Sequence, residues 1–162
     1  PDAYVMPHLN NAFDSSNNSW WFGQFKAQGG KFDMVALSHY PQYEKDPSGT
    51  NSKAVSYIKS VAAAMGVPVM VSEVGVKTPA GESTAKSLLK SFVDQVRKLD
   101  QCAGVFYWEP EVDGVWKPEI YTKPAELTKY TGVTQSGPWN AYDQGAFTTS
   151  GAPTSVLDVF SE

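Results

Sequence analysis

The chain has 162 residues, and its 13 basic and 17 acidic side chains give a net charge of −4. This mild acidity, without any block of Lys or Arg, argues against nucleic acid as the main partner. The single cysteine, Cys102, excludes an intramolecular disulfide and a zinc site built on several cysteines. No apolar run approaches the roughly 20 residues of a membrane-spanning helix. The length suits one packed domain or part of a larger one.

Four short apolar runs predict buried parallel strands. Each run is nearly continuous and rich in valine, which is typical of strands that are covered on both faces. If the strands open at Ala3, Asp33, Pro68 and Ala103, they are spaced by 30, 35 and 35 positions, the length of a strand plus a returning helix. The runs are Ala3–Met6, Met34–Leu37, Val67–Val71 and Gly104–Trp108.

The segments after these runs predict helices. The third segment carries the clearest apolar stripe, and Gly66 supplies a C-terminal stop for the second. The expected helices run from Asn18 or Ser19 to Phe25, from Thr50 or Asn51 to Met65, along Leu88–Leu99, and from about Ala152 to Phe160.

Four β-α units in succession are compatible with two architectures, an open doubly wound sheet or a closed eight-unit barrel. A barrel needs about 250 residues, so this chain would be about half of one. We treat residues 1–162 as one half of a domain with a long loop at about 109–151, which carries Trp116, Tyr121, Tyr130, Trp139 and Tyr142. The chain opens at Pro1 without a Met, so we expect its natural start to be missing.

Polar and aromatic side chains follow every predicted strand. In parallel α/β folds the ligand face lies at these C-terminal strand ends. Carboxylates beside aromatic rings suit sugar chemistry, because a carboxylate stabilises or attacks an oxocarbenium-like centre while flat rings cover pyranose faces. Glu73 is the best candidate, although a structural ion pair with Lys or Arg is an equal alternative. The strand-end residues are His8, Asn10, Ser38, His39, Tyr40, Ser72, Glu73, Trp108 and Glu109.

The two histidines and Glu109 have more than one interpretation. His8 and His39 are candidate substrate ligands or acid–base groups, and the alternative for each is a hydrogen-bonded strand-end histidine. A metal site with His8, His39 and Glu73 is the minor reading, and we predict none. Glu109 is the second strand-end carboxylate, but its place before Pro110 disfavours a role as the general acid. We expect the acid on a strand before Pro1.

Four segments, in order, resemble the arabinogalactan endo-β-1,4-galactanases of glycoside hydrolase family 53. The resemblance extends over essentially the whole chain, and the residues around Trp139–Ala141, Phe147 and Gly151–Pro153 are similar to the family's ending. The segments are Met6–Asn11 with Asp14 and Trp20–Phe22 following, Phe32–Pro41, Pro68–Gly75 and Gly104–Pro110.

The resemblance implies strands five to eight of a retaining (β/α)₈ glycosidase. It implies that Glu73 is the nucleophile, that Tyr40 donates a hydrogen bond to it, and that Trp108 floors the subsite beside the scissile bond. The family's acid/base, a Glu after an Asn on strand four, has no counterpart in this sequence. The residues implied to line the cleft are His8, Asn10 and Asp14.

Other implications concern specificity, ions and partners. His39 stands where the family commonly has tyrosine. No cofactor is required, although Asp113, Asn140 and Asp143 are candidate calcium ligands. The implied substrate is β-1,4-galactan, and the implied location is secreted, periplasmic or at the cell surface. We expect the chain to pair with an N-terminal half barrel or with itself. The alternatives are a related mannanase or cellulase, and a non-catalytic sugar-binding half barrel.

Overall fold

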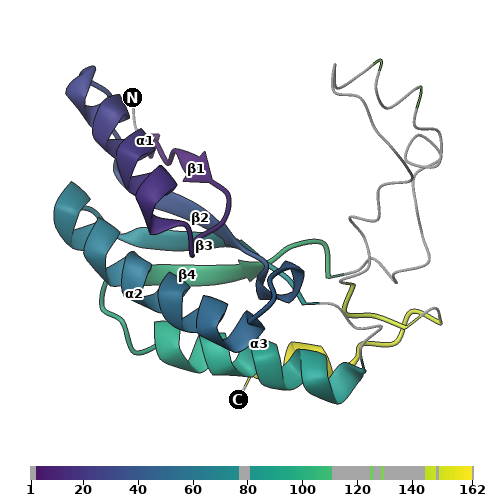
Figure 1. Ribbon diagram of the computed structural model, residues 1–162. Helices are drawn as coiled ribbons and strands as arrows, with labels where there is room; N and C mark the ends of the chain where they lie inside the picture. The colour runs from purple at the N-terminus through teal and green to yellow at the C-terminus, as the bar shows by residue number, and fades with distance from the viewer. Residues whose placement is uncertain are drawn as a thin grey trace.

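The structure, a computed structural model, describes residues 3–76, 81–110, 125, 129, 145–148 and 150–161. Its centre is a sheet of four parallel strands in the order β1-β2-β3-β4, so each strand lies beside its neighbour in the sequence. A helix connects each strand to the next (Figure 1). The strands are β1 (His8–Leu9), β2 (Val35–His39), β3 (Val69–Val74) and β4 (Cys102–Tyr107).

The connecting helices begin and end at residues with clear local roles. Asp14 caps α1 by accepting a hydrogen bond from the Asn17 N–H at 3.1 Å, and Asp46 caps α2 by accepting one from the Gly49 N–H at 3.0 Å. α2 stops at Gly66, whose φ of +74° lies in the left-handed region that glycine adopts without strain. The helical elements are α1 (Ser15–Ala27), the 3₁₀-helix η1 (Pro41–Tyr43), α2 (Pro47–Met65), α3 (Glu82–Val96) and the 3₁₀-helix η3 (Ser155–Phe160).

The second, third and fourth predicted strands are confirmed, but the first was expected too early. Tyr4 and Val5 are exposed by 85% and 51%, and β1 begins only at His8. The Val5 N–H donates to a carboxylate oxygen of Asp33 at 2.8 Å rather than to a backbone carbonyl. The apolar composition of this run therefore marks the approach to the strand and not the strand itself.

Two predicted helix starts and the last predicted helix also need correction. Asp14 caps α1 and Asp46 caps α2, so both helices begin several residues before their predicted starts. The predicted caps Asn18 and Asn51 instead lie inside these helices, where their buried side chains donate to backbone carbonyls of other segments. The final segment is helical and ends at Phe160 as predicted, but it is the six-residue 3₁₀-helix η3, which begins at Ser155 rather than near Ala152. Among the described residues, no helix has the length and apolarity needed to cross a membrane.

One face of the sheet carries the hydrophobic core. Alternate side chains of β2 and β3 are fully buried there against three helices, and α2 and α3 lie along this side of the sheet in Figure 1. Near the opposite face, which we call the open face, Met6 and Phe106 are 40% and 60% exposed. The core residues that best mark the covered face are Val35, Leu37, Val69, Val71, Phe22, Ile58 and Phe92.

The strand order decides between the two architectures. A doubly wound sheet reverses its strand order and places helices on both faces. Here the order is sequential and the helices contribute to one core on one face, as in a barrel that has been divided between strands. The chain therefore has the fold predicted for it, half of a (β/α)₈ barrel.

The C-terminal 3₁₀-helix η3 is fastened along α3. Lys86 Nζ lies 3.0 Å from the Asp158 carboxylate, and the Arg97 guanidinium donates to the Val159 carbonyl at 2.9 Å. At the other end of α3 the Ser155 N–H donates to a carboxylate oxygen of Glu82 at 2.6 Å. These contacts hold the described end of the chain on the outer layer.

Candidate active site

Glu73 lies near the C-terminal end of β3, and a bulge in that strand determines which way its side chain points. Val71 is fully buried on the helix side, so regular alternation would send residue 73 to that side too. The register shifts here, because Leu37 pairs with Val71 while Ser38 pairs with Glu73. The extra residue puts Val74 on the helix side, and the Glu73 carboxylate joins Ser38 on the open face.

Two hydroxyl groups hold one oxygen of the Glu73 carboxylate. Ser38 Oγ–H donates to Oε2 at 2.9 Å, and the Tyr40 hydroxyl donates to the same oxygen at 2.8 Å. Both donors come from the end of β2, two positions apart and therefore on the same side of the chain. No residue that the structure describes donates a hydrogen bond to Oε1. The carboxylate thus has one fixed oxygen and one available oxygen.

His8 extends this network to β1. Its Nε2 lies 2.6 Å from Ser38 Oγ, and its Nδ1 lies 3.9 Å from Glu73 Oε1, beyond hydrogen-bond range. Because Ser38 uses its single proton on the carboxylate, the serine oxygen accepts from His8, which requires the proton on Nε2. Side chains from three neighbouring strands therefore form one chain of hydrogen bonds from His8 through Ser38 to Glu73.

The surroundings of Glu73 suit chemistry better than a structural ion pair. Within the described part of the chain no Lys or Arg lies within ion-pair distance of this carboxylate, and its side chain is 23% exposed. An ionised carboxylate that accepts two O–H hydrogen bonds is oriented without being neutralised. Such a group can attack an electrophilic carbon or accept a proton.

Asn10 lies on an exposed turn just after β1. Its side-chain oxygen accepts from the Asn11 N–H at 2.7 Å, and Asn11 has a left-handed φ of +54°. The side-chain amide of Asn18, which is buried in α1, donates to the carbonyls of Asn10 and Asn11 at 3.1 and 3.0 Å. The structure therefore brings Asn10 to the same strand edge as His8 and shows that Asn18, which sequence reasoning treated only as a helix cap, braces the turn.

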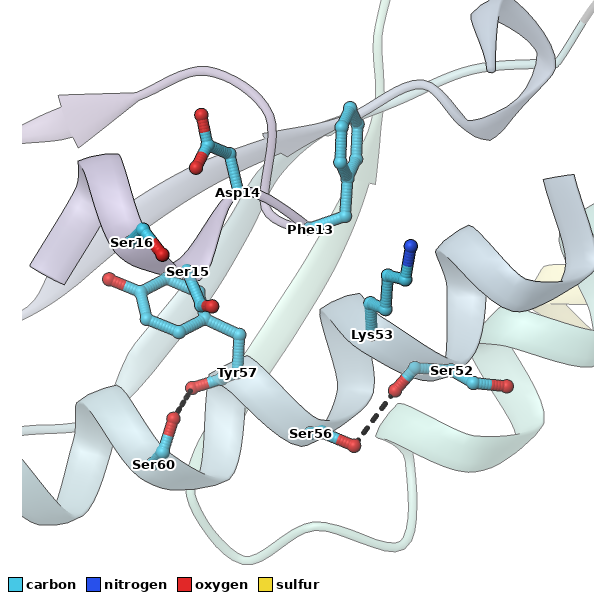
Figure 2. A pocket seen from close by; sticks show the side chains of 9 residues that line it. All are labelled: Phe13, Asp14, Ser15, Ser16, Ser52, Lys53, Ser56, Tyr57 and Ser60. Atoms are coloured by element: carbon cyan, nitrogen blue, oxygen red, sulfur yellow. Dashed lines mark hydrogen bonds between the residues drawn. The ribbon is translucent and has the colours of Figure 1, made fainter. Parts of the chain in front are cut away.

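The Asp14 side chain caps α1, and no described contact joins it to Glu73. It borders a groove of about 700 Å³ between the start of α1 and the side of α2 (Figure 2). Figure 2 shows Lys53 and Tyr57 of α2 across the groove. Burial raises the pKa of Tyr57, and a 3.5 Å hydrogen bond from Ser19 opposes this shift. Asp14 therefore faces the outer surface between two helices.

The prediction that His39 binds substrate does not fit its position. Its ring is fully buried on the helix side, where it packs against Phe92 with ring centres 4.3 Å apart. Its Nε2 lies 2.8 Å from the side-chain oxygen of Asn51. Burial lowers the pKa of His39 to about 4, against which the hydrogen bond with Asn51 acts, so the ring is neutral at neutral pH. The prediction was wrong because adjacent residues of a strand point to opposite faces of the sheet. Ser38 and Tyr40 reach Glu73 on the open face, so His39 between them points to the helices.

Trp108 follows β4, and its backbone N–H continues the ladder by donating to the Val74 carbonyl at 2.9 Å. Its side chain is 43% exposed, whereas the neighbouring Tyr107 packs on the helix side against Phe160. Burial raises the pKa of Tyr107 to about 12, so its hydroxyl stays protonated. By alternation Trp108 lies on the open face, beside the strand that carries Glu73.

At Glu109 the chain leaves the strand direction. Its φ of +48° is in the left-handed region, which costs a non-glycine residue about 1–2 kcal/mol. The next residue, Pro110, accepts a hydrogen bond from the Ala146 N–H at 2.7 Å. No described contact joins the Glu109 and Glu73 carboxylates. The two strand-end carboxylates therefore do not form a contacting pair.

Some predicted features lie outside the described residues, and one residue of the hydrogen-bond network was undervalued. The calcium candidates and the loop aromatics fall in the part of the chain that is not described, while the described part holds no group of three His, Cys, Asp or Glu side chains arranged for a metal. Ser38 was noted at a strand end but not chosen as a site residue. The sequence could have indicated Ser38, because it stands two residues before Tyr40 and residues two apart in a strand point to the same face. The undescribed candidates are Asp113, Asn140, Asp143, Trp116, Tyr121, Tyr130, Trp139 and Tyr142.

Two fungal proteins are among the sequence relatives of this chain. The chain is 27% identical over 133 residues to the arabinogalactan endo-β-1,4-galactanase of Thermothelomyces thermophilus and 25% identical over 130 residues to that of Humicola insolens. Each match includes 68% of this chain and 39% of the relative. The chain therefore spans well under two thirds of the length of these relatives.

Comparison of structures and of family profiles completes the assignment. A structure from a study of two fungal β-1,4-galactanases superposes on this chain with a TM-score of 0.68 at 22% identity. The superposition covers 100% of this chain and 48% of the galactanase chain. That likeness supports the half-barrel fold. The family model described as glycosyl hydrolase family 53 matches residues 1–85, more than half of the chain. The chain therefore belongs to glycosyl hydrolase family 53.

Proposed function

We propose that this chain provides the nucleophile half of a retaining endo-glycosidase that hydrolyses β-1,4-galactan. The observation that carries the proposal is the Glu73 carboxylate on the open face, with Oε2 held by Ser38 and Tyr40. Family membership and the names of the two fungal relatives support galactan as the substrate class. The retaining course is proposed because Glu73 is oriented as an attacking group.

In the proposed reaction Glu73 Oε1 attacks the anomeric carbon of a bound galactose unit. The carbon–oxygen bond to the leaving sugar breaks as a general acid protonates that oxygen. Water then attacks the glycosyl ester, loses a proton to the same acid–base group, and frees the Glu73 carboxylate. The hydroxyls of Ser38 and Tyr40 keep Oε2 in place through both steps, so Oε1 needs little reorganisation to attack.

We further propose that the acid–base carboxylate comes from the other half of the barrel. Glu109 is the other strand-end carboxylate of this chain, and its backbone turns away from the strand. A retaining pair requires carboxyl groups about 5–5.5 Å apart. The exposed Met6 and Phe106 near the open face offer apolar surface to that other half. Self-association is the alternative arrangement.

Three further side chains are proposed to contact the sugar. His8 and Asn10 line the cleft from β1, and the exposed Trp108 ring stacks on a pyranose face. Contacts from Asp14 and Glu109 remain predictions that depend on a long substrate reaching the sheet edge. Because galactan is a polymer outside the cell, we propose that the enzyme acts as a secreted, periplasmic or surface protein.

Substitution of Glu73 tests the proposal in the complete protein. Glu73→Gln keeps the size of the side chain but removes the attacking charge, so hydrolysis of β-1,4-galactan should fall on the order of 10³-fold or more. Glu44→Gln, at an exposed residue of the same type, is the matched control and should keep wild-type activity. Product release is measured as reducing ends on galactan, mannan and cellulose.

The outcomes separate the alternatives. Activity on mannan or cellulose but not galactan would assign a related glycanase. Galactan binding without turnover, unchanged by Glu73→Gln, would indicate a sugar-binding module. Full activity of Glu73→Gln would refute the nucleophile assignment.

A further inference from the structure

His39 lies directly behind the candidate active site, on the opposite face of the sheet. It is the last residue of β2, and its ring is fully buried between the sheet and the helices. The Phe92 ring of α3 packs against it at 4.3 Å and an interplanar angle of 35°, and the Phe13 ring meets it edge-on at 6.4 Å. The imidazole is thus confined from two sides by aromatic rings.

A hydrogen-bond chain fixes the remaining freedom of this imidazole. The Asn51 amide nitrogen donates to the Leu88 carbonyl at 3.0 Å and to Ser91 Oγ at 2.8 Å. Because the Leu88 carbonyl can only accept, the amide oxygen of Asn51 must face His39. That oxygen accepts from His39 Nε2–H at 2.8 Å. Through Asn51 of α2, the end of β2 is therefore tied to the backbone of α3.

The residues on both sides of His39 are the two that hold Glu73. Ser38 and Tyr40 point to the open face while His39 points to the helices. In the register, Ser38 lies opposite Glu73 and His39 lies opposite Val74. β2 ends at His39, and the chain turns into η1 at Pro41, so His39 is the last strand residue that can anchor Tyr40.

The Nδ1 atom gives the buried imidazole a cost that an apolar ring would not have. Nδ1 is buried and has no hydrogen-bond partner among the described residues. A buried polar atom without a partner carries a desolvation cost, which a phenyl ring in the same aromatic surroundings would avoid. The gain that offsets this cost is the directional bond from Nε2 to Asn51.

We propose that His39 is a positioning residue, whose hydrogen bond to Asn51 and packing against Phe92 hold the end of β2 so that Ser38 and Tyr40 both donate to Glu73 Oε2. The inference rests on the proposed nucleophilic role of Glu73. His39 touches no substrate and acts only through its two neighbours. It explains why a fully buried histidine stands between two residues of the candidate active site.

The test compares three variants of the complete protein. His39→Phe keeps a buried ring but loses the bond to Asn51, whereas His39→Gln places an amide N–H near the position of Nε2. Val61→Ala, in the core part of α2 and away from the strand end, is the control for lost stability. The probe is a 2-deoxy-2-fluorogalactoside with a dinitrophenolate leaving group. The dinitrophenolate departs without an acid, and the fluorogalactosyl group stays bonded to the attacking carboxylate as an ester.

We expect the labelling rate to fall in His39→Phe, and we expect the rates of the three variants not to change in parallel with their Tm values. Measured by intact mass well below the unfolding temperature, His39→Phe should label roughly tenfold more slowly, the effect of about 1.4 kcal/mol in the barrier. His39→Gln should recover to within about threefold of wild type, and Val61→Ala should lower Tm without changing the rate. Equal rates for wild type and His39→Phe would overturn the proposal.

Crystal structures provide a readout that needs no activity. In His39→Phe the distances from Ser38 Oγ and Tyr40 Oη to Glu73 Oε2 should lengthen beyond 3.5 Å, and in His39→Gln they should stay near 2.9 and 2.8 Å. Unchanged distances in His39→Phe would overturn the positioning role. If wild type is never labelled but these distances change, the proposed glycosidase function fails while the positioning role stands.

Discussion

The two oxygens of the Glu73 carboxylate are in different environments. Oε2 accepts from Ser38 and Tyr40, while Oε1 lies 3.9 Å from His8 Nδ1 without a hydrogen bond. Two donors on one oxygen fix the plane of the carboxylate, which leaves the other oxygen directed at one place. For a nucleophile this asymmetry reduces the reorganisation needed before bond formation.

Removing one of these donors should slow the reaction without abolishing it. Tyr40→Phe deletes a hydrogen bond to a charged group, which contributes about 1.5–3 kcal/mol, so kcat/KM on galactan should fall by roughly 10- to 150-fold. Tyr43→Phe, at an exposed tyrosine of η1, the 3₁₀-helix that directly follows Tyr40, serves as the comparison. A kcat/KM for Tyr40→Phe within twofold of the Tyr43→Phe value would show that the Tyr40 hydroxyl does not support catalysis.

Strand-end position identified Glu73, Tyr40 and His8 from the sequence, and the structure brings their side chains into one network. The face that each residue occupies could not be predicted in the same way. His39 was placed with them because it is at the same strand end, yet alternation sends it to the core. For Glu73 alternation alone would have given the wrong face, because one extra residue in β3 leaves no signature in the sequence.

At the scale of elements, the helix ends depend on carboxylate caps that the apolar pattern does not indicate. Asp46 precedes α2 and accepts from the Gly49 N–H, four to five residues before the expected start at Thr50 or Asn51. An apolar stripe locates the buried face of a helix, but its first turns are often polar. The central residues of the strands and the end of α2 at Gly66 were predictable. A continuous apolar run and a glycine in the left-handed conformation are both signals carried by the residues at that place in the sequence.

The cap of α2 offers a direct test of this element. Asp46→Ala removes the acceptor for the Gly49 N–H, so the free energy of unfolding should fall by about 1 kcal/mol. Glu44→Ala changes an exposed carboxylate two residues earlier and should change it by less than about 0.5 kcal/mol. Urea denaturation followed by circular dichroism measures both values. Equal effects of the two substitutions would exclude a capping role for Asp46.

For the whole molecule, the buried neutral His39 couples folding to pH. Its pKa is about 4 in the folded chain and about 6.5 when exposed, so below pH 6.5 the unfolded chain binds a proton that the folded chain does not. The contribution to stability is therefore present at neutral pH and is lost as pH falls from 6.5 towards 4. Between pH 7 and pH 5 this loss amounts to about 2 kcal/mol.

Comparison with a variant that does not titrate isolates this contribution. The unfolding free energy of wild type minus that of His39→Gln should fall by about 2 kcal/mol as the pH is lowered from 7 to 5. Carboxylates common to both proteins cancel in the difference. A constant difference across this range would mean that folding does not lower the pKa of His39.

The shifted register of β3 has a consequence for how this gene can change. Loss of the Ser72 codon would remove the extra residue and leave a strand that alternates regularly from Val71, with the acidic group still on the open face and the following valine still in the interior. At this point of the strand the number of residues is therefore less constrained than the two side chains that flank the extra residue. In a library of in-frame deletions, loss of Ser72 should therefore be far less damaging than loss of Met70, where the strand alternates regularly and the residues on one side of the gap would change face.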